Sequence, residues 1–578
     1  MERRVLIAIF LSFLVLYLYQ ALIVKPQPKP AAAPVAGTTS AAPAAPSGAP
    51  VVPEAPDAKT GAPELKATAG PKAATLVGET AEREIRVETR DVIATFTNRG
   101  ARLKSWRLKH YFDQQREPQE LVENQLVNQP LPFTLRTGSE SLNATLNSAL
   151  YAMSGAPEAS GASAPTDLRF EYRDSAGVHA VKTFRLDAAS YLLTFGGTVT
   201  EAETPVPFAI VWGPAIGDIA EASRYLQKAE GILFENGKVQ RQAASGIVKQ
   251  PVFEGDFKYA GVDDNYFMSV AFNPGPSKVT YQPVSIPPPA NTKEAARELV
   301  SYSIAPQRQD VPVRFFAGPK DFDVLAAIDT DATRAINFGM FTVIVVPLLK
   351  SLKWVNGFIG NWGWSIIILT VIINAIMLPL RHKSVVSMRK MQEIQPQVKA
   401  IQDRYAKLKA TDPGKQKMNQ ELMGLYKERG VNPAGGCVPM LLTFPLIFAF
   451  YALLSTAIEL RGAPFFGWIH DLTAHDPYYI TPILMGISQV WQQRITPQTG
   501  ADPAQAKMMM FMPVVFTFMF LWAPAGLAIY WFVSNVWGIG QQYLTNHLIG
   551  PPKVRTVRPP AERMKRVGGG KTEAARDS

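Results

Sequence analysis

The chain has 578 residues, of which 47% are hydrophobic, and a formal net charge of +11 at pH 7. This length is enough for several domains, and the hydrophobic residues gather after residue 336, so one uniform soluble fold is excluded. The single cysteine, Cys437, excludes an internal disulfide and any metal site made of several cysteines.

The first apolar segment, residues 5–24, has about the twenty residues that a helix needs to cross a bilayer. Arg3 and Arg4 precede it, which favours a cytoplasmic N-terminus. The segment is longer than the apolar part of a secretory signal peptide, and no convincing small-residue cleavage site follows it directly. We therefore expect residues 1–25 to be a retained transmembrane anchor.

Residues 26–79 are dominated by Pro, Ala, Gly and Thr, a composition that predicts a disordered linker. From there to residue 335, apolar and polar side chains alternate, and turn sequences such as Asn236-Gly237 separate the alternating stretches. Many short strands without alternating helices predict a large antiparallel β-sandwich at residues 80–335. No catalytic motif is evident in this domain, and we expect Asp263-Asp264 to form a solvated turn.

Hydrophobicity rises from residue 338. Residues 336–356 are expected to form an amphipathic helix on the membrane surface, with Val343, Val346, Leu349 and Leu352 on its apolar face. Five apolar segments follow, at residues 364–380, 440–458, 479–492, 508–522 and 527–543. With the N-terminal anchor they predict an α-helical transmembrane bundle of six spans, with its core at residues 357–548.

Basic residues orient these spans. Residues 381–435 are rich in Lys and Arg, whereas residues 459–478 contain Arg461 as their only cation. Because positive charge favours the cytoplasmic side, both termini are predicted to be cytoplasmic and the β domain periplasmic. Within 381–435, apolar residues recur at spacings of three and four on both sides of Asp412-Pro413-Gly414, which predicts a cytoplasmic helical hairpin. The basic tail, residues 549–578, is then cytoplasmic as well.

Motifs typical of enzymes occur in this sequence only in incomplete form. Gly570-Lys571-Thr572 resembles the end of a phosphate-binding loop, but Lys565 stands where the motif needs glycine. His470-Asp471 and His475-Asp476 resemble metal-hydrolase dipeptides, but they lie in one short loop without further ligands. We therefore expect no catalytic residue, no metal, no cofactor and no nucleotide.

Polar side chains inside the spans are more informative, because they are costly in a membrane and usually face the bundle interior or a hydrated cavity. Thr370, Asn374 and Arg381 share one helix face. Three more polar residues lie in later spans: Gln489, Gln492 and Ser534. Their bias toward the cytoplasmic halves of the spans favours a hydrated groove open to the cytoplasm. Hydrogen bonding between helices alone is the simpler alternative.

Six segments, in the correct order, resemble the YidC/Oxa/Alb family of membrane protein insertases: residues 361–367, 432–437, 459–465, 468–472, 476–479 and 511–513. The long N-terminal part resembles the Gram-negative form, whose periplasmic domain is similar to sugar-mutarotase sandwiches. The resemblance implies a bacterial inner-membrane insertase and chaperone for nascent membrane proteins, working in the lipid bilayer, alone or with the Sec translocon. The basic tail could contact ribosomal RNA or simply anchor the C-terminus by its charge.

The resemblance also implies groove residues. Thr370 matches a groove threonine of the family, and Tyr530 and Trp531 match an aromatic pair on its last span. The family places an arginine in the groove where this chain has Asn374, so we predict that Arg381 supplies the positive charge instead. A client's apolar helix is expected to leave into lipid along Phe444, Phe448 and Leu527.

Two other classes of protein fit the sequence less well. A secondary transporter predicts inverted repeats, and the sequence shows no internal repeat. A sugar-binding enzyme with a membrane anchor leaves the five C-terminal spans unexplained.

Overall fold

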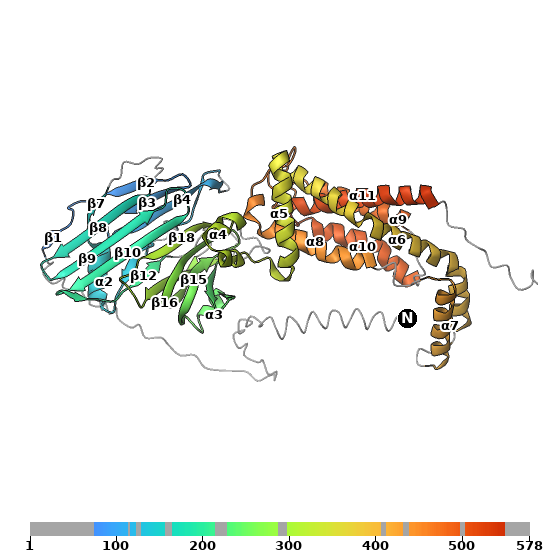
Figure 1. Ribbon diagram of the computed structural model, residues 1–578, viewed down its shortest axis with the longest axis horizontal. Helices are drawn as coiled ribbons and strands as arrows, with labels where there is room; N and C mark the ends of the chain where they lie inside the picture. The colour runs from blue at the N-terminus through green and yellow to red at the C-terminus, as the bar shows by residue number, and fades with distance from the viewer. Residues whose placement is uncertain are drawn as a thin grey trace, which may run out of the picture.

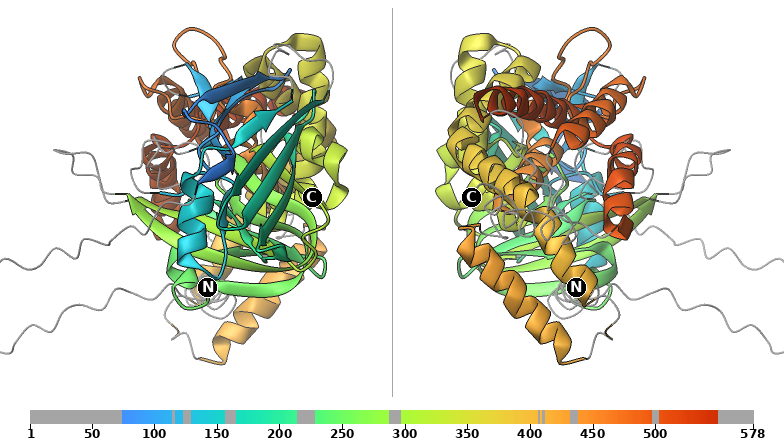
Figure 2. Two further views of the ribbon diagram at one scale, coloured as in Figure 1. Left: turned by 90° about the vertical axis from the view of Figure 1, so that its left-hand side faces the viewer. Right: turned by 90° about the vertical axis from the view of Figure 1, so that its right-hand side faces the viewer.

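The computed structural model describes residues 74–113, 116–122, 129–155, 165–213, 228–286, 297–405, 408, 412–431, 438–496 and 503–549. The expected N-terminal anchor, nearly all of the expected linker, Cys437 and the basic tail lie outside the described residues. The molecule is elongated, with β-sheets at one end and helices at the other (Figures 1 and 2).

The β domain consists of two antiparallel sheets, one of fourteen and one of four strands, which confirms the predicted sandwich. The larger sheet contains β1 (Thr75–Val77), β6 (Thr134–Arg136), β7 (Ala152–Ser154), β8 (Thr166–Asp174), β9 (Val178–Leu186), β10 (Leu192–Glu201), β11 (Thr204–Pro205), β12 (Ala209–Trp212), β13 (Glu230–Glu235), β14 (Lys238–Gln242), β15 (Val252–Asp263), β16 (Phe267–Ile286), β17 (Arg297–Pro306) and β18 (Val313–Pro319). The smaller sheet contains β2 (Glu84–Glu88), β3 (Val92–Thr97), β4 (Arg102–Phe112) and β5 (Pro118–Glu120).

The two sheets share one apolar core. Phe133 packs within 5.2 Å, between ring centroids, of Phe184, Phe195 and Phe315. The indole nitrogen of Trp106 in β4 donates a hydrogen bond to the Ala317 carbonyl in β18 at 2.8 Å, so a polar contact also joins the sheets. Alternating burial along β2, β8 and β9, as the sequence predicts, contributes to this core.

The expected turn at Asn236-Gly237 joins β13 to β14 with a positive φ at both residues, 51° and 75°. These values suit the two-residue hairpin turns that favour this dipeptide. Two expectations differ from the structure. Strand β1 begins at Thr75, inside the expected linker. The solvated turn at Asp263-Asp264 is wrong, because the Asp263 side chain is fully buried and lies 3.0 Å from the equally buried Lys320 ammonium.

Short helices that the sequence analysis did not predict accompany the sheets: α2 (Glu140–Ser148), α3 (Ala244–Ile247) and α4 (Phe322–Ile328), with the 3-10 helix η1 (Thr330–Ala335). The helical part contains η2 (Gly339–Phe341), α5 (Thr342–Ile359), α6 (Trp362–Arg404), α7 (Gly414–Glu428), α8 (Val438–Thr456), η4 (Ile458–Leu460), α9 (Ile480–Ile495), α10 (Pro503–Phe520) and α11 (Ala525–Ile549). Helices α6 and α8–α11 correspond to the five expected spans.

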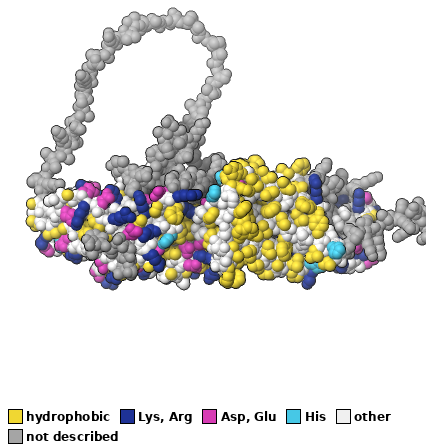
Figure 3. All heavy atoms as spheres, turned by 90° about the horizontal axis from the view of Figure 1, so that it is seen from above, with side chains coloured by type: hydrophobic (Ala, Val, Ile, Leu, Met, Phe, Trp, Pro, Cys, Tyr) yellow, Lys and Arg dark blue, Asp and Glu magenta, His cyan; other side chains and the backbone are white. Residues whose placement is uncertain are grey.

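Helix α11 is the centre of the bundle. It packs against α6, α8 and α9, whereas α10 packs chiefly on α9. Two helices of the described chain, Gly339–Ile359 and Trp362–Arg404, are long and apolar enough to cross a membrane by length and composition. Hydrophobic side chains cover the visible face of the bundle as a broad band, and charged ones gather on the β domain and at the opposite end (Figure 3). The six-span arrangement itself stays a prediction.

Helix α5 lies across the end of the bundle next to the β domain rather than along it (Figure 1). Leu349 and Leu352 of this helix are buried, as expected, but Val343 is 84% exposed and does not belong to the buried face. The exposed Trp354 and Phe358 pack edge to face, with ring centroids 5.1 Å apart. That this helix lies on the membrane surface stays a prediction.

The expected boundary between the first of these spans and the hairpin, at residue 381, has no break in the structure. Helix α6 runs without interruption through both, and Ile394 and Val398 near its end pack against Met418 and Leu422 of α7. These four residues belong to the apolar residues whose spacing of three and four predicted the helical hairpin. Helix α7 and the last part of α6 lie at the end of the molecule farthest from the β domain (Figure 1).

Candidate functional site

The polar residues of α6 meet α11 in the bundle interior. Thr370 is fully buried and donates its hydroxyl hydrogen to the Ile366 carbonyl at 2.6 Å. Asn374, one turn later, donates to the Thr370 carbonyl at 2.8 Å and reaches the Ser534 hydroxyl oxygen on α11 at 3.4 Å. Among the described residues the Asn374 carbonyl oxygen has no partner, although it is buried. A buried acceptor of this kind suits a water molecule or a polar group of a ligand.

The aromatic pair of α11 divides between two neighbours, because successive side chains on a helix point about 100° apart. Tyr530 is buried and stacks on Phe450 of α8, with ring centroids 4.0 Å apart. Trp531 packs against Phe516 and Phe520 of α10. Tyr530 and Trp531 therefore place α11 between the two helices α8 and α10, which do not pack closely on each other in the described chain.

Gln489 and Gln492 of α9 lie against α11. Gln489 accepts a hydrogen bond from the Trp531 indole nitrogen at 3.0 Å. Gln492 lies over Gly538, where an added Cβ would come within 2.2 Å of the glutamine amide nitrogen, so a larger residue there would displace the Gln492 amide. A deeper contact joins the same helices, since Asn535 donates to the Ser488 hydroxyl oxygen at 3.0 Å.

Arg381 lies on α6 seven residues after Asn374, which is about 10 Å further along the same face. Among the described residues it makes no hydrogen bond and no ion pair. Its guanidinium is near enough to the Tyr530 phenol to interact with it electrostatically, and that phenol also neighbours Ser534.

The structure does not bring Phe444 and Phe448 to this cluster. They are 37% and 51% exposed, and Phe448 stacks on Phe444 and on Phe341 of η2, away from the α8 face that carries Phe450. Leu527, expected on the same exit path, is only 2% exposed because it packs inside the bundle. For Leu527 the expectation of a lipid-facing position is wrong.

Trp537 and Gln541 of α11 were not singled out as site residues by the sequence analysis. The Trp537 indole nitrogen and both polar atoms of the Gln541 amide are buried without a partner among the described residues. Gln541 follows Ser534 by seven residues, as Arg381 follows Asn374. The sequence did contain a signal for Gln541. The same seven-residue spacing occurs on two helices that run in the same direction, between Asn374 and Arg381 on α6 and between Ser534 and Gln541 on α11.

The loop between α8 and α9, residues 457–479, folds over the end of the bundle next to the β domain. Ile458, Leu460 and Leu472 are buried in it. The backbone nitrogen of Gly526 at the start of α11 donates to the Leu472 carbonyl at 3.0 Å. Asn361, the N-cap of α6, donates to the Phe465 carbonyl at 3.1 Å. This α8–α9 loop thus closes one end of the polar cluster with backbone and apolar contacts.

Asp476 organises the loop. One carboxylate oxygen accepts hydrogen bonds from the Trp468 indole and the Tyr478 backbone at 2.9 Å each, and the other accepts the backbone N–H and the hydroxyl of Thr481. Burial raises the pKa of Asp476, but these donors outweigh it and lower the pKa below its usual range. His475 stacks on Tyr479 instead of joining Asp476. Over the described residues no group of three or more His, Cys, Asp or Glu side chains could hold a metal.

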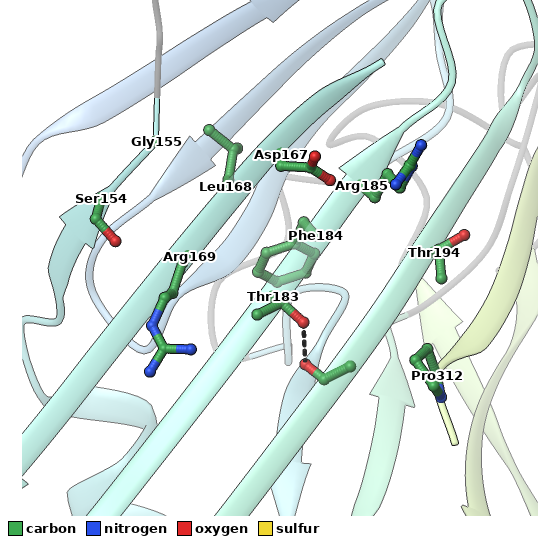
Figure 4. Close-up of a pocket in the computed structure, with 11 residues that line it drawn as sticks. Ser154, Gly155, Asp167, Leu168, Arg169, Thr183, Phe184, Arg185, Thr194 and Pro312 are labelled. Carbon is green, nitrogen blue, oxygen red and sulfur yellow. Dashed lines mark hydrogen bonds between the residues drawn. The ribbon is translucent and has the colours of Figure 1, made fainter. Parts of the chain in front are cut away.

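A cavity of about 430 Å³ lies elsewhere, on the exposed face of strands β8, β9 and β10 (Figure 4). Arg169, Thr183 and Thr194 line it, with Asp167 and Arg185 opposite each other on adjacent strands. It belongs to the β domain and shares no residue with the polar cluster of α6, α9 and α11.

Two protein families match the chain. The family described as "YidC periplasmic domain" matches residues 84–351, and that described as "60Kd inner membrane protein" matches residues 354–551. The membrane protein insertase YidC of Syntrophus aciditrophicus is 33% identical over 568 residues, covering 94% of this chain and 99% of the relative. That of Geobacter metallireducens is 34% identical, covering 96% of this chain and all of the relative.

Solved structures resemble the chain more distantly. A crystal structure of an active YidC insertase with its first transmembrane domain resolved covers 82% of this chain and 95% of its own, at 19% identity and a TM-score of 0.33. A galactose 1-epimerase from Lactobacillus acidophilus covers 43% of this chain and 99% of its own, at 10% identity and a TM-score of 0.27. Because both TM-scores are below 0.5, the family assignment rests on the sequence matches.

Proposed function

Because the chain belongs to the YidC family of membrane protein insertases, we propose that it inserts nascent membrane proteins through the polar cluster of α6, α9 and α11. It is an inner-membrane protein with a periplasmic domain, and its substrates are membrane proteins. Insertion changes no covalent bond, so we assign binding and guiding roles to the cluster and no catalytic residue.

The physical task is to carry a hydrophilic segment past hydrocarbon. A charged side chain costs about 2.5–3.5 kcal/mol at the centre of a membrane helix on the insertion scale. Polar groups that hold water within the bundle shorten the apolar distance to be crossed. Asn374, Ser534 and Gln541 would hold that water, and the buried, unpartnered atoms of Asn374 and Gln541 support this role.

The positive charge of the groove comes from Arg381 in our proposal. It lies on the face of Asn374, has no ion-pair partner among the described residues and neighbours Tyr530. An acidic client segment would therefore meet an uncompensated cation at the groove mouth. Asn374 and Thr370 would act deeper in the bundle, by hydration alone.

The client's apolar helix would leave between α8 and α10, since α11 separates these helices and they do not pack closely on each other in the described chain. Phe444 and Phe448, exposed on α8, supply an apolar surface along this route. We place both termini and the α6–α7 hairpin in the cytoplasm from the positive charge of residues 381–435. Action beside the Sec translocon and a ribosome contact through the basic tail belong to the same proposal.

The observation that carries the proposal is the hydrogen-bonded and partly unpartnered polar cluster within apolar helices. Reconstituting the purified chain in liposomes and scoring insertion of a small coat-like client tests it. We expect insertion without a nucleotide, and reduced insertion when Asn374, Ser534 and Gln541 are replaced together by Leu, Ala and Leu. The matched control replaces Ser148, an exposed residue of the β domain, by Ala. Full insertion by the triple variant at equal protein level would contradict the groove.

A further inference from the structure

One cation joins the β domain to the closed end of the bundle. The Lys353 ammonium in α5 lies 2.9 Å from the Glu459 carboxylate in the α8–α9 loop. It also lies 2.7 Å from Asp323 and 3.6 Å from Asp321, both at the start of α4. Within the described chain, Lys353 is the only cation within ion-pair distance of these three carboxylates.

The three acidic partners of Lys353 differ in how deeply they are buried. The Glu459 side chain is 5% exposed and that of Asp321 is 14% exposed, whereas Asp323 is 68% exposed. Asp321 also caps α4 by accepting the backbone N–H groups of Asp323 and Val324. One carboxylate therefore belongs to the α8–α9 loop and two belong to the start of α4 in the β domain, and the Lys353 ammonium lies within ion-pair distance of all three.

Further contacts show that this is a docking surface. Asn265, in the turn before β16, donates to the Ser455 carbonyl at the end of α8 at 2.8 Å. The Arg461 guanidinium lies over the rings of Tyr266 and Phe267, 5.4 and 5.2 Å from their centroids, and donates to Gln119 of β5 at 3.1 Å. Each contact reaches the same short stretch, residues 455–461, which begins the loop that closes the bundle.

We propose that Lys353 is a positioning residue that holds the α8–α9 loop shut over the periplasmic end of the groove by binding Glu459 and the α4 carboxylates together. This inference rests on the proposed function for its meaning, since it names what keeps the groove from opening outward. Without Lys353, Glu459 and Asp321 face each other as buried like charges, and the loop is pushed away from the β domain.

Protonation of Glu459 relieves this repulsion. Burial raises the pKa of Glu459, the Asp321 charge raises it further, and Lys353 lowers it. The phenol of Tyr111 in β4 also interacts electrostatically with Glu459. Removal of Lys353 takes away the lowering contribution, so Glu459 binds a proton more readily. A chain lacking Lys353 should therefore open at neutral pH and close again as the pH falls.

Thiol labelling measures this opening. Replacing Cys437 by Ser and Ala457, which is 1% exposed at the start of the loop, by Cys leaves one reporter thiol beneath the closed end. A membrane-impermeant maleimide is added from the outside to the full chain in proteoliposomes.

We expect K353M to raise the labelling rate of this thiol about tenfold or more at pH 8. K353R should restore slow labelling, and the double variant K353M/E459Q should restore it as well. K353M alone should label more slowly again at pH 5.5, after correction for the intrinsic pH dependence measured on a free thiol.

A second reporter, Met418→Cys, monitors the separate apolar cluster of α6 and α7, far from the α8–α9 loop. Its labelling, measured in detergent, should not change with K353M. Equal labelling of the Ala457→Cys reporter with and without K353M overturns the proposal, as does acceleration at both reporters. Since labelling needs no client, this outcome is separate from that of the insertion assay on the unaltered chain, which tests the insertase proposal.

Discussion

The indole nitrogen of Trp531 donates a hydrogen bond to the side-chain oxygen of Gln489 at 3.0 Å, and this bond joins α11 to α9 in the bundle interior. The same indole ring packs on Phe516 and Phe520 of α10. One side chain thereby fixes the mutual position of three helices.

Trp531→Phe should keep the ring contacts and leave Gln489 unpaired, at a cost of about 1 kcal/mol of folding free energy. Denaturant unfolding in a fixed detergent measures it. Trp531→Phe combined with Gln489→Leu removes both polar groups and should recover most of the loss. A double variant as unstable as the sum of the singles would show that the hydrogen bond is not the cause.

Arg381→Ala should slow insertion of clients with acidic translocated segments and spare neutral ones, because it removes the cation at the groove mouth. Asn374→Ala should affect both modestly, since it removes an amide and no charge. Paired acidic and neutral versions of one client, compared in the same proteoliposomes, provide the measurement. Equal slowing of both clients by Arg381→Ala would instead mean that the side chain only anchors α6 at the headgroups.

Asp264→Asn should make the stability of the β domain less dependent on pH. Burial raises the pKa of Asp264 to about 7, against the opposing backbone N–H groups of Phe267 and Tyr266 and the Lys320 charge. The unfolded carboxyl titrates at about 3.9, so the folded state binds this proton more tightly and loses stability as the pH rises from about 4 to about 7. Asparagine still accepts both backbone N–H groups without a charge.

The measurement for Asp264→Asn is the unfolding temperature of the full chain between pH 5 and pH 8, with the exposed Asp256→Asn as the matched control. We expect the variant to be more stable than the parent at pH 8, and by a clearly smaller margin at pH 5. A parallel downward shift at every pH would contradict the assigned origin.

Deletion of residues 80–310 should leave insertion largely intact, because no proposed groove residue comes from that part of the chain. The deletion keeps Asp321, Asp323 and Lys353, and with them the ionic contact to Glu459. Growth of a depletion strain that carries the truncated chain at normal level measures the effect. Complete loss of viability at that level would refute the prediction.

Truncation after Gly550 should weaken ribosome co-sedimentation if the basic tail contacts RNA, and rising salt should weaken the binding of the full chain in the same way. Binding that is insensitive to both changes would leave only an anchoring role for the tail.

Sequence patterns determined the elements of this protein because local chemistry decides them. Alternating strands, the Asn236-Gly237 hairpin, the apolar helices and the seam of Ile394 and Val398 were all visible as spacings, and six ordered segments identified the family. The tertiary structure alone decided which distant side chains meet. Asp263-Asp264 reads as a polar turn in sequence, yet folding buries Asp263 against Lys320, 57 residues away. Leu527 and Phe448 are equally apolar, yet one packs inside and the other lies exposed. Partners such as Lys353 and Glu459, 106 residues apart, leave no periodic signal, because their contact depends on how whole elements pack and not on the local backbone.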